Sequence, residues 1–286
     1  MLKLNEVKSI LREYNIRPSK RLGQNFLIDQ NIKNKIIEAV ELDSEDTVLE
    51  IGPGLGALTQ DLCIKAKKVI AVEKDKRLYD FLLNKMDILS VRRSELELIN
   101  GDILKYQFKD ISSKLVVVGN LPYSISSPIL NHIINNRGHV KSIYITVQAE
   151  FGERLVALPG SKDCSSLSCY AQFYGDPKIL FKIPRGVFLP TPEVDSSFLN
   201  INFEKQIDES IDQEMLFKII RSSFEKRRKT ILNSLSSSGI FKSKKDALIC
   251  LTRADILPAR RPETISLQEF INLSRQLALQ SDNSKA

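Results

Sequence analysis

The alternation of strand patterns and helix patterns between residues 47 and 157 most constrains the fold of this chain. Short apolar segments rich in β-branched residues are typical of buried strands. They occupy residues 47–51, 69–72, 96–99, 115–119 and 143–147. Segments with apolar residues at helical spacing follow most of them, at residues 55–66, 75–89, 128–134 and 150–157. This order predicts a mostly parallel sheet that is covered by helices on both faces.

The pattern changes near residue 206. Before it, two late strands are expected at residues 178–183 and 197–203. After it only helical patterns occur, at residues 214–224, 229–235, 244–251 and 266–279, and the polar end from residue 280 is expected to be disordered. We therefore expect an α/β domain with a basic N-terminal arm over residues 1–206 and a smaller all-helical domain over residues 207–286.

Charge and residue usage narrow the classes of function. The net charge of +7 and the pI of about 9.1 favour a polyanionic partner. No apolar run approaches the ~20 residues of a membrane helix. The charged N-terminus also lacks the apolar core of a signal peptide, so we expect a cytoplasmic protein without a membrane partner. The four cysteines lack the spacing of a zinc site and only two histidines occur, so no metal site is expected.

A glycine-rich turn follows the first predicted strand. Residues 52–56 read Gly-Pro-Gly-Leu-Gly, and glycines permit tight turning and close approach of the backbone to a ligand. The spacing is not that of a full dinucleotide-binding turn, and Pro53 removes an N–H that could bind a pyrophosphate. Glu50 precedes the first glycine and suits a cationic ligand better than a diphosphate. These features turn the interpretation away from NAD.

Polar residues also stand at the ends of the next three predicted strands. Glu73 follows the second strand, where a carboxylate binds ribose hydroxyls in this topology. Asp102 follows the third, where it could accept a hydrogen bond from an adenine amino group, and Asn120 follows the fourth. Each alone is more often a turn residue or a helix cap. Because the carboxyl ends of such strands meet in one crevice, their coincidence favours S-adenosylmethionine as the ligand.

Residues 120–123, Asn-Leu-Pro-Tyr, suit an amine-bearing base. The Asn120 side-chain oxygen can accept a hydrogen bond from an NH₂ group. Leu121 precedes a proline, which favours an extended backbone with its carbonyl pointing outward. Tyr123 offers a flat face for stacking. The alternative is a plain strand followed by a proline-containing turn that Asn120 caps.

The chain resembles the KsgA (RsmA) family of ribosomal RNA small-subunit adenine dimethyltransferases over nearly its whole length. The matching motifs are residues 23–27, 50–56, 101–102, 120–123, 188–196 and 227–235, together with Glu73. Two departures occur. The family often has Gln-Lys-Glu where this chain has Gln-Ala-Glu at residues 148–150, and Tyr-Gly-Arg where it has Cys-Ser-Ser at residues 164–166. Any RNA contact carried over to those positions therefore stays open.

The resemblance implies a Rossmann-like S-adenosylmethionine-dependent methyltransferase sheet with a helical C-terminal domain. The residues that it places around S-adenosylmethionine are Asn25, Leu27, Gly52, Glu73, Asp102 and Asn120. For Arg227 and Arg228, it favours contact with the RNA backbone over the alternative that they lie on a merely solvated helix face. It also implies the substrate: two adjacent adenosines in a hairpin loop of small-subunit ribosomal RNA, each methylated twice during ribosome assembly, with an immature small subunit as the partner.

For the chemistry, we expect positioning and amine polarisation rather than a histidine base. The Asn120 side-chain oxygen and the Leu121 carbonyl would accept the two amine hydrogens of adenine and aim the nitrogen lone pair at the methyl carbon. Tyr123 would stack on the base. Phe188 would close the other face of the base or, almost as readily, serve as packing between the two domains.

Three other functions are compatible with parts of this pattern. An adenine methyltransferase of the antibiotic-resistance type would modify large-subunit ribosomal RNA. A DNA enzyme would usually have Asn/Asp-Pro-Pro-Tyr, from which Leu121 departs. A non-catalytic ribosome-assembly factor would not need the intact set of strand-end residues. No long heptad pattern occurs, so a monomer is expected.

Overall fold

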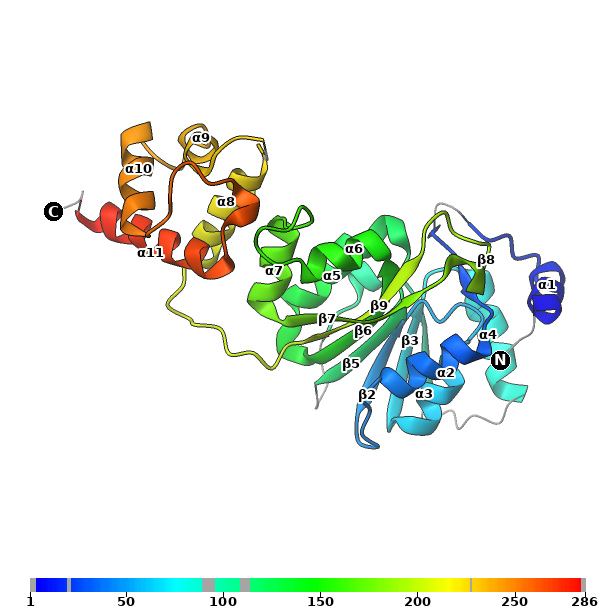
Figure 1. Cartoon of the computed structure of the whole chain (residues 1–286). Coiled ribbons are helices and arrows are strands. Elements are labelled where there is room, and N and C mark those ends of the chain that lie inside the picture. The colour runs from blue at the N-terminus through cyan, green and yellow to red at the C-terminus, as the bar shows by residue number, and fades with distance from the viewer. Residues whose placement is uncertain (1–3, 20–21, 89–95, 109–113, 227, 284–286) are drawn as a thin grey trace. The chain divides into compact units, whose positions relative to one another are not determined.

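The computed structural model describes residues 4–19, 22–88, 96–108, 114–226 and 228–283 (Figure 1). The chain divides into two compact units. The first comprises Met1–Gly152 and Lys178–Glu204, and the second comprises Glu153–Pro177 and Lys205–Ala286. The boundary expected after residue 206 stays a prediction, and the contacts within the chain additionally group Glu153–Pro177 with the C-terminal helices.

The main sheet has seven strands. Their spatial order is β4 (Leu96–Asn100), β3 (Lys68–Glu73), β2 (Thr47–Ile51), β5 (Leu115–Asn120), β6 (Val140–Gln148), β9 (Ser196–Asn202) and β7 (Asp176–Ile183). The first five are mutually parallel, and β9 runs antiparallel to β6. The predicted α/β class with a mostly parallel sheet is therefore confirmed.

The strand order reverses between β2 and β5, and this reversal places the site. The chain moves from β2 outward to β3 and β4, then returns to β5 and moves outward to β6. Right-handed crossovers in the two directions put their helices, α3 (Thr59–Lys65) and α5 (Ser126–Asn135), on opposite faces of the sheet. At such a reversal the loops at the carboxyl ends of the strands diverge and leave a crevice.

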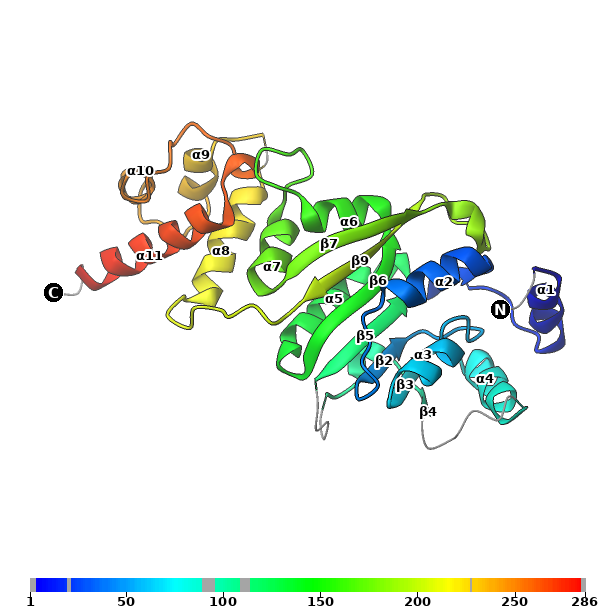
Figure 2. The same cartoon turned by 60° about the horizontal axis from the view of Figure 1, so that its bottom comes forward.

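Apolar side chains of two helices cover the face of the sheet that carries Val48, Val116 and Val118. The helices are α2 (Gln30–Ala39) and α3, which Figures 1 and 2 show on the same side of the sheet. Asp29 caps the start of α2, because its carboxylate accepts a hydrogen bond from the Ile32 N–H at 2.9 Å.

The basic N-terminal arm contains the helix α1 (Leu4–Glu13), which packs on α4 (Lys76–Ile88). Val7 is buried in a cluster with apolar side chains of α4. The rings of Tyr14 and Phe81 lie edge to face, 5.1 Å apart. The arm is therefore anchored to the α/β unit by its apolar face.

Gly119 lies close against the neighbouring central strand β2. A Cβ atom there would lie 2.9 Å from the Ile51 carbonyl oxygen and 3.0 Å from the Ile51 Cβ. We expect Gly119→Ala to lower the free energy of unfolding by about 1–3 kcal/mol, because the adjacent strand must shift. Urea unfolding measures the loss. Gly138→Ala is the matched control, since a Cβ at Gly138 meets no atom within 4 Å; equal stability of the two variants would contradict the expectation.

The second unit contains α7 (Ser166–Tyr174), α8 (Gln213–Phe224), α9 (Ile231–Ser236), α10 (Lys244–Arg253) and α11 (Leu267–Asn283). Its aromatic core joins α7 to α8, with the rings of Phe173 and Phe217 5.3 Å apart. The expected all-helical C-terminal part is confirmed for the described residues. The expected disorder from residue 280 is wrong up to Asn283, because α11 continues to that residue.

The helix α7 was not predicted from the sequence. Its start carries a capping box in which Ser165 and Ser168 bond each other's backbone N–H groups. A serine in place of the usual glutamate or glutamine at the third helical position weakens that signal in a sequence. Within the described parts of the chain, every helix is too short or too polar to cross a membrane.

Candidate active site

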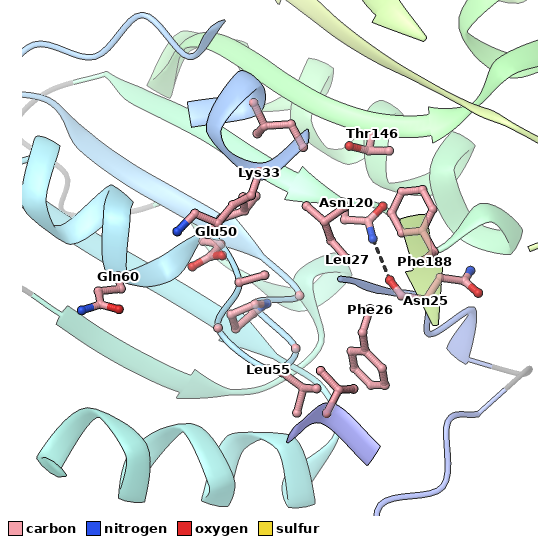
Figure 3. A pocket seen from close by; sticks show the side chains of 18 of the residues that line it. Asn25, Phe26, Leu27, Lys33, Glu50, Leu55, Gln60, Asn120, Thr146 and Phe188 are labelled. Carbon is pink, nitrogen blue, oxygen red and sulfur yellow. Dashed lines mark hydrogen bonds between the residues drawn. The ribbon is translucent and has the colours of Figure 1, made fainter. Parts of the chain in front are cut away.

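Two adjoining cavities lie at the carboxyl ends of the central strands. The first has a volume of about 240 Å³ (Figure 3) and the second of about 100 Å³. Both are lined by Asn25, Phe26, Gly52, Gly54 and Asn120. The crevice expected from the strand order is therefore a real space in the first unit.

The glycine-rich turn lines both cavities. Gly52, Gly54 and Gly56 have φ of +64°, +60° and +75°, a region in which side chains with a Cβ are strained. The helix α3 accordingly begins at Thr59, not at residue 55 as predicted, because left-handed residues cannot continue a right-handed helix. The Gly54 N–H donates to Glu73 Oε2 at 3.1 Å, which ties the turn to the next strand.

Glu73 ends β3 and faces the second cavity. Its side chain is buried, and its two oxygens accept hydrogen bonds from the backbone N–H groups of Gly54 and Asp75. Burial raises the pKa of Glu73, while these hydrogen bonds act in the opposite direction.

Asp102 lines the same cavity and also caps a 3₁₀ turn, Ile103–Lys105. Its carboxylate accepts from the Leu104 N–H at 3.1 Å and from Lys74 Nζ at 2.6 Å. The hydrogen bond from Lys74 lowers the pKa of Asp102. The functional and the capping interpretation of this residue are therefore compatible.

Glu50 lines the first cavity but was not among the residues predicted to bind the cofactor. It lies in the central strand β2 with 2% of its surface exposed, and its Oε2 has no hydrogen-bond partner among the described residues. Burial raises the pKa of Glu50 to about 8; the Thr59 hydroxyl opposes this shift and the charge of Glu73 adds to it. The sequence signal was a charged residue within an otherwise apolar central strand.

Asn120 has a fixed side-chain orientation. Its amide nitrogen donates to the backbone carbonyl of Asn25 at 2.9 Å (Figure 3). Since a carbonyl can only accept, the Asn120 nitrogen must face Asn25, and the side-chain oxygen points to the Phe188 side of the cavity. The 3₁₀ turn Tyr123–Ile125 is capped by Pro122 and α5 by Ile125, so Asn120 is not a helix cap.

The other residues predicted for the chemistry lie at different depths. Phe188 is buried and lines the first cavity, where β8 (Phe188–Leu189) pairs with β1 (Phe26–Leu27). Leu121 is buried and its N–H donates to the Thr146 carbonyl at 3.0 Å. The Tyr123 hydroxyl bonds Ser196 Oγ at 2.6 Å, and burial raises its pKa. Neither Leu121 nor Tyr123 lines the two cavities.

The remaining predicted residues divide between the two units. Asn25, Leu27 and Gly52 line the first cavity with Asn120. Arg228 is exposed in the second unit, between α8 and α9, and Arg227 lies outside the described residues. In the described part of the chain no three His, Cys, Asp or Glu side chains gather as ligands for a metal ion.

Comparison with known proteins identifies the family of the chain. The family model described as ribosomal RNA adenine dimethylase matches residues 15–277. A protein from Moorella thermoacetica named ribosomal RNA small subunit methyltransferase A is 41% identical over 281 residues, which cover 94% of this chain and 96% of that protein. A protein of the same name from Bacillus mycoides is 40% identical over 285 residues, 96% of each.

A solved structure agrees over most of the chain. The crystal structure of a dimethyladenosine transferase from Plasmodium falciparum aligns with a TM-score of 0.76 and 27% identity, covering 91% of this chain and 98% of that one. The Rossmann-like methyltransferase fold is thereby confirmed. With the family match over residues 15–277, the conclusion is direct: this chain belongs to the ribosomal RNA adenine dimethylase family.

Proposed function

We propose that this protein transfers methyl groups from S-adenosylmethionine to the exocyclic amines of two adjacent adenosines in a hairpin loop of small-subunit ribosomal RNA, dimethylating each during ribosome assembly. One observation carries the proposal. The Asn120 amide is held by the Asn25 carbonyl so that its oxygen, an acceptor for an amine, faces a cavity large enough for a ligand. The names of the relatives, which refer to the small subunit, support the choice of RNA.

The two cavities fit the methyl donor by the chemistry of their linings. S-adenosylmethionine supplies a methyl group that is activated by a positively charged sulfonium. Glu73 would bind the ribose hydroxyls and Asp102 the adenine amino group in the second cavity. Asn25, Leu27 and Gly52 would line the rest of the donor site. Glu50 Oε2, which has no hydrogen-bond partner in the described part of the chain, suits the donor's positive charge.

The acceptor side needs geometry rather than a base. The Asn120 side-chain oxygen and the Leu121 carbonyl would accept the two amine hydrogens and draw the nitrogen toward tetrahedral geometry. Tyr123 would stack on one face of the base after a side-chain movement that makes its ring accessible. Phe188 would lie against the other face of the base. Proton loss to solvent after transfer completes the reaction, so no histidine is required.

The target must reach this site outside a duplex, as a looped or flipped base. Arg227 and Arg228 would contact the phosphate backbone of the RNA, which positions it without reading sequence. The surplus of positive charge supports this contact. We further propose that the protein acts as a monomer in the cytoplasm, where its immature small-subunit substrate would be met.

A labelling experiment tests the proposed function against its alternatives. The protein is incubated with radiolabelled S-adenosylmethionine and, separately, with naked small-subunit RNA, immature small subunits, large-subunit RNA and DNA, and modified bases are mapped. We expect dimethyladenosine at two adjacent positions of small-subunit RNA. Label in large-subunit RNA or in DNA would show that the proposed substrate is wrong. No label, together with intact binding of S-adenosylmethionine, would indicate a non-catalytic assembly factor.

A further inference from the structure

Residues 23–25, just before β1, contact residues 120–123, the segment proposed to hold the target amine. Gly23 has φ of +60°, and a Cβ atom there would lie 2.9 Å from Pro122 Cβ, so the backbone at Gly23 lies directly against residues 120–123. Two residues later, the Asn25 carbonyl accepts the hydrogen bond that orients Asn120. The position of residues 23–25 therefore sets the orientation of the Asn120 amide.

Gln24 lies between these two contacts and lines the second cavity, where we propose that the methyl donor binds. Gln24 Nε2 donates to Asp75 Oδ2 at 3.1 Å, and Gln24 Oε1 accepts from the Ser19 N–H at 2.8 Å. The backbone N–H of the same Asp75 donates to Glu73 Oε1 at 2.8 Å. Asp75 thus touches both Gln24 and the carboxylate proposed to bind the donor's ribose.

The contact between Gln24 and Asp75 is built to be firm. Asp75 has 6% of its surface exposed and accepts from Arg77 through the backbone N–H, Nε and Nη2, at 2.9 to 3.1 Å. Burial alone would raise the pKa of Asp75, but the hydrogen bonds from Arg77 and Gln24 lower it, so the side chain is an anion. A hydrogen bond from an amide to an anion is stronger than one between neutral groups. Arg77 Nη1 also donates to the Asn15 carbonyl at 3.3 Å, which extends the network to the arm.

We propose that Gln24 and Asp75 are positioning residues that couple the donor half of the site to the acceptor half. The proposal rests on the proposed function, because it assigns Glu73 to the donor and Asn120 to the target amine. A donor held by Glu73 stabilises the turn at Asp75, the turn holds Gln24, and Gln24 fixes residues 23–25 against residues 120–123. A bound donor would thereby further stabilise the orientation of the Asn120 amide that the Asn25 carbonyl already sets.

Coupling of this kind has a signature that a merely structural contact lacks. In the unaltered protein, S-adenosylhomocysteine and an RNA hairpin carrying the target loop should each tighten the binding of the other by the same factor, about 10-fold for a typical coupling. We expect Gln24→Ala to bring this factor close to 1 and to lower kcat about 10-fold. Because Gln24 lines the second cavity, its loss should weaken the binding of S-adenosylhomocysteine alone by less than about 10-fold, the effect of one hydrogen-bonding group. Calorimetric titrations with and without the second ligand measure the factor.

Two further variants make the test specific. Exchanging the groups in the double variant Gln24→Glu, Asp75→Asn restores an amide-to-carboxylate hydrogen bond in the opposite direction and should recover part of the coupling. Lys76→Ala is the matched control, since Lys76 adjoins Asp75 but pairs with the exposed Asp80 on the same helix.

The outcomes separate the two proposals. Methylation of RNA by the unaltered protein together with unchanged kcat and coupling in Gln24→Ala overturns the positioning role alone. A loss of S-adenosylhomocysteine affinity much larger than about 10-fold in Gln24→Ala also overturns it, because the main role of Gln24 would then be to bind the donor. Absence of methylation by the unaltered protein overturns the proposed function and this proposal with it.

Discussion

Asn120→Ala is expected to lose methyl transfer to RNA by about 100- to 1000-fold, the range for removing one group that stabilises a transition state. The reason is the orientation of the amide. With its nitrogen bound to the Asn25 carbonyl at 2.9 Å, the side-chain oxygen has one direction left, toward the place proposed for the amine. Alanine removes that acceptor and leaves the Glu73 and Asp102 contacts of the second cavity intact.

Single-turnover methylation and calorimetric binding of S-adenosylhomocysteine separate the two roles of Asn120. We expect donor affinity to change by less than about 10-fold, since only one hydrogen-bonding group is lost from that side. Asn120→Asp is an informative companion variant. Its carboxylate keeps an oxygen that can accept a hydrogen bond, but it loses the N–H group that donates to the Asn25 carbonyl. Near-normal turnover of the alanine variant would remove Asn120 from the chemistry.

Glu50→Gln is expected to change how stability depends on pH. The pKa of Glu50 is raised from 4.5 to about 8, so the folded protein binds a proton that the unfolded chain releases. The stability associated with this proton is fully present below pH 4.5 and is lost as the pH rises through about 8. At about 1.4 kcal/mol per pKa unit, the loss is on the order of several kcal/mol. Glutamine does not titrate, so the variant should keep more of its stability above pH 8.

Urea unfolding between pH 5 and pH 9, without ligand, measures this difference. Glu45→Gln is the control, because Glu45 forms an exposed ion pair with Lys67 and is not buried. The affinity for the methyl donor should respond in the opposite direction. A positively charged donor favours ionised Glu50, so Glu50→Gln should weaken donor binding most at high pH. Parallel stability curves for Glu50→Gln and the unaltered protein would show that Glu50 does not titrate in this range.

The sequence was sufficient for the α/β order and for the residues at the strand ends, because both depend on local patterns. Glu73 and Asn120 each end a β-branched run, and parallel strands bring such ends together. The start of α3 at Thr59 was not predictable from apolar spacing, since the left-handed glycines before it interrupt the helix. The contact of Asn120 with Asn25 joins residues 95 positions apart, and no local pattern encodes it.

Glu50 illustrates a different limit. A single charged residue within a strand pattern indicates an unusual environment. Whether its side chain finds a hydrogen-bond partner depends on every element around it, and among the described residues Glu50 Oε2 finds none. The same holds for Tyr123, whose hydroxyl bonds Ser196 on a strand that the chain adds 73 residues later. Long-range contacts of this kind require coordinates.

The pairing of β1 with β8 determines when, during synthesis, the site can be completed. Phe26 and Leu27 precede every strand of the main sheet, yet their partners are Leu189 and Phe188. During synthesis from the N-terminus, the first cavity cannot gain the wall at Phe188 until about two thirds of the chain has left the ribosome. Contacts this distant in sequence also slow folding, because a long loop must close before they form. A nascent chain that has made β2 and β5 but not residue 188 thus has the crevice without this wall, and the first cavity is enclosed only once β8 has paired with β1.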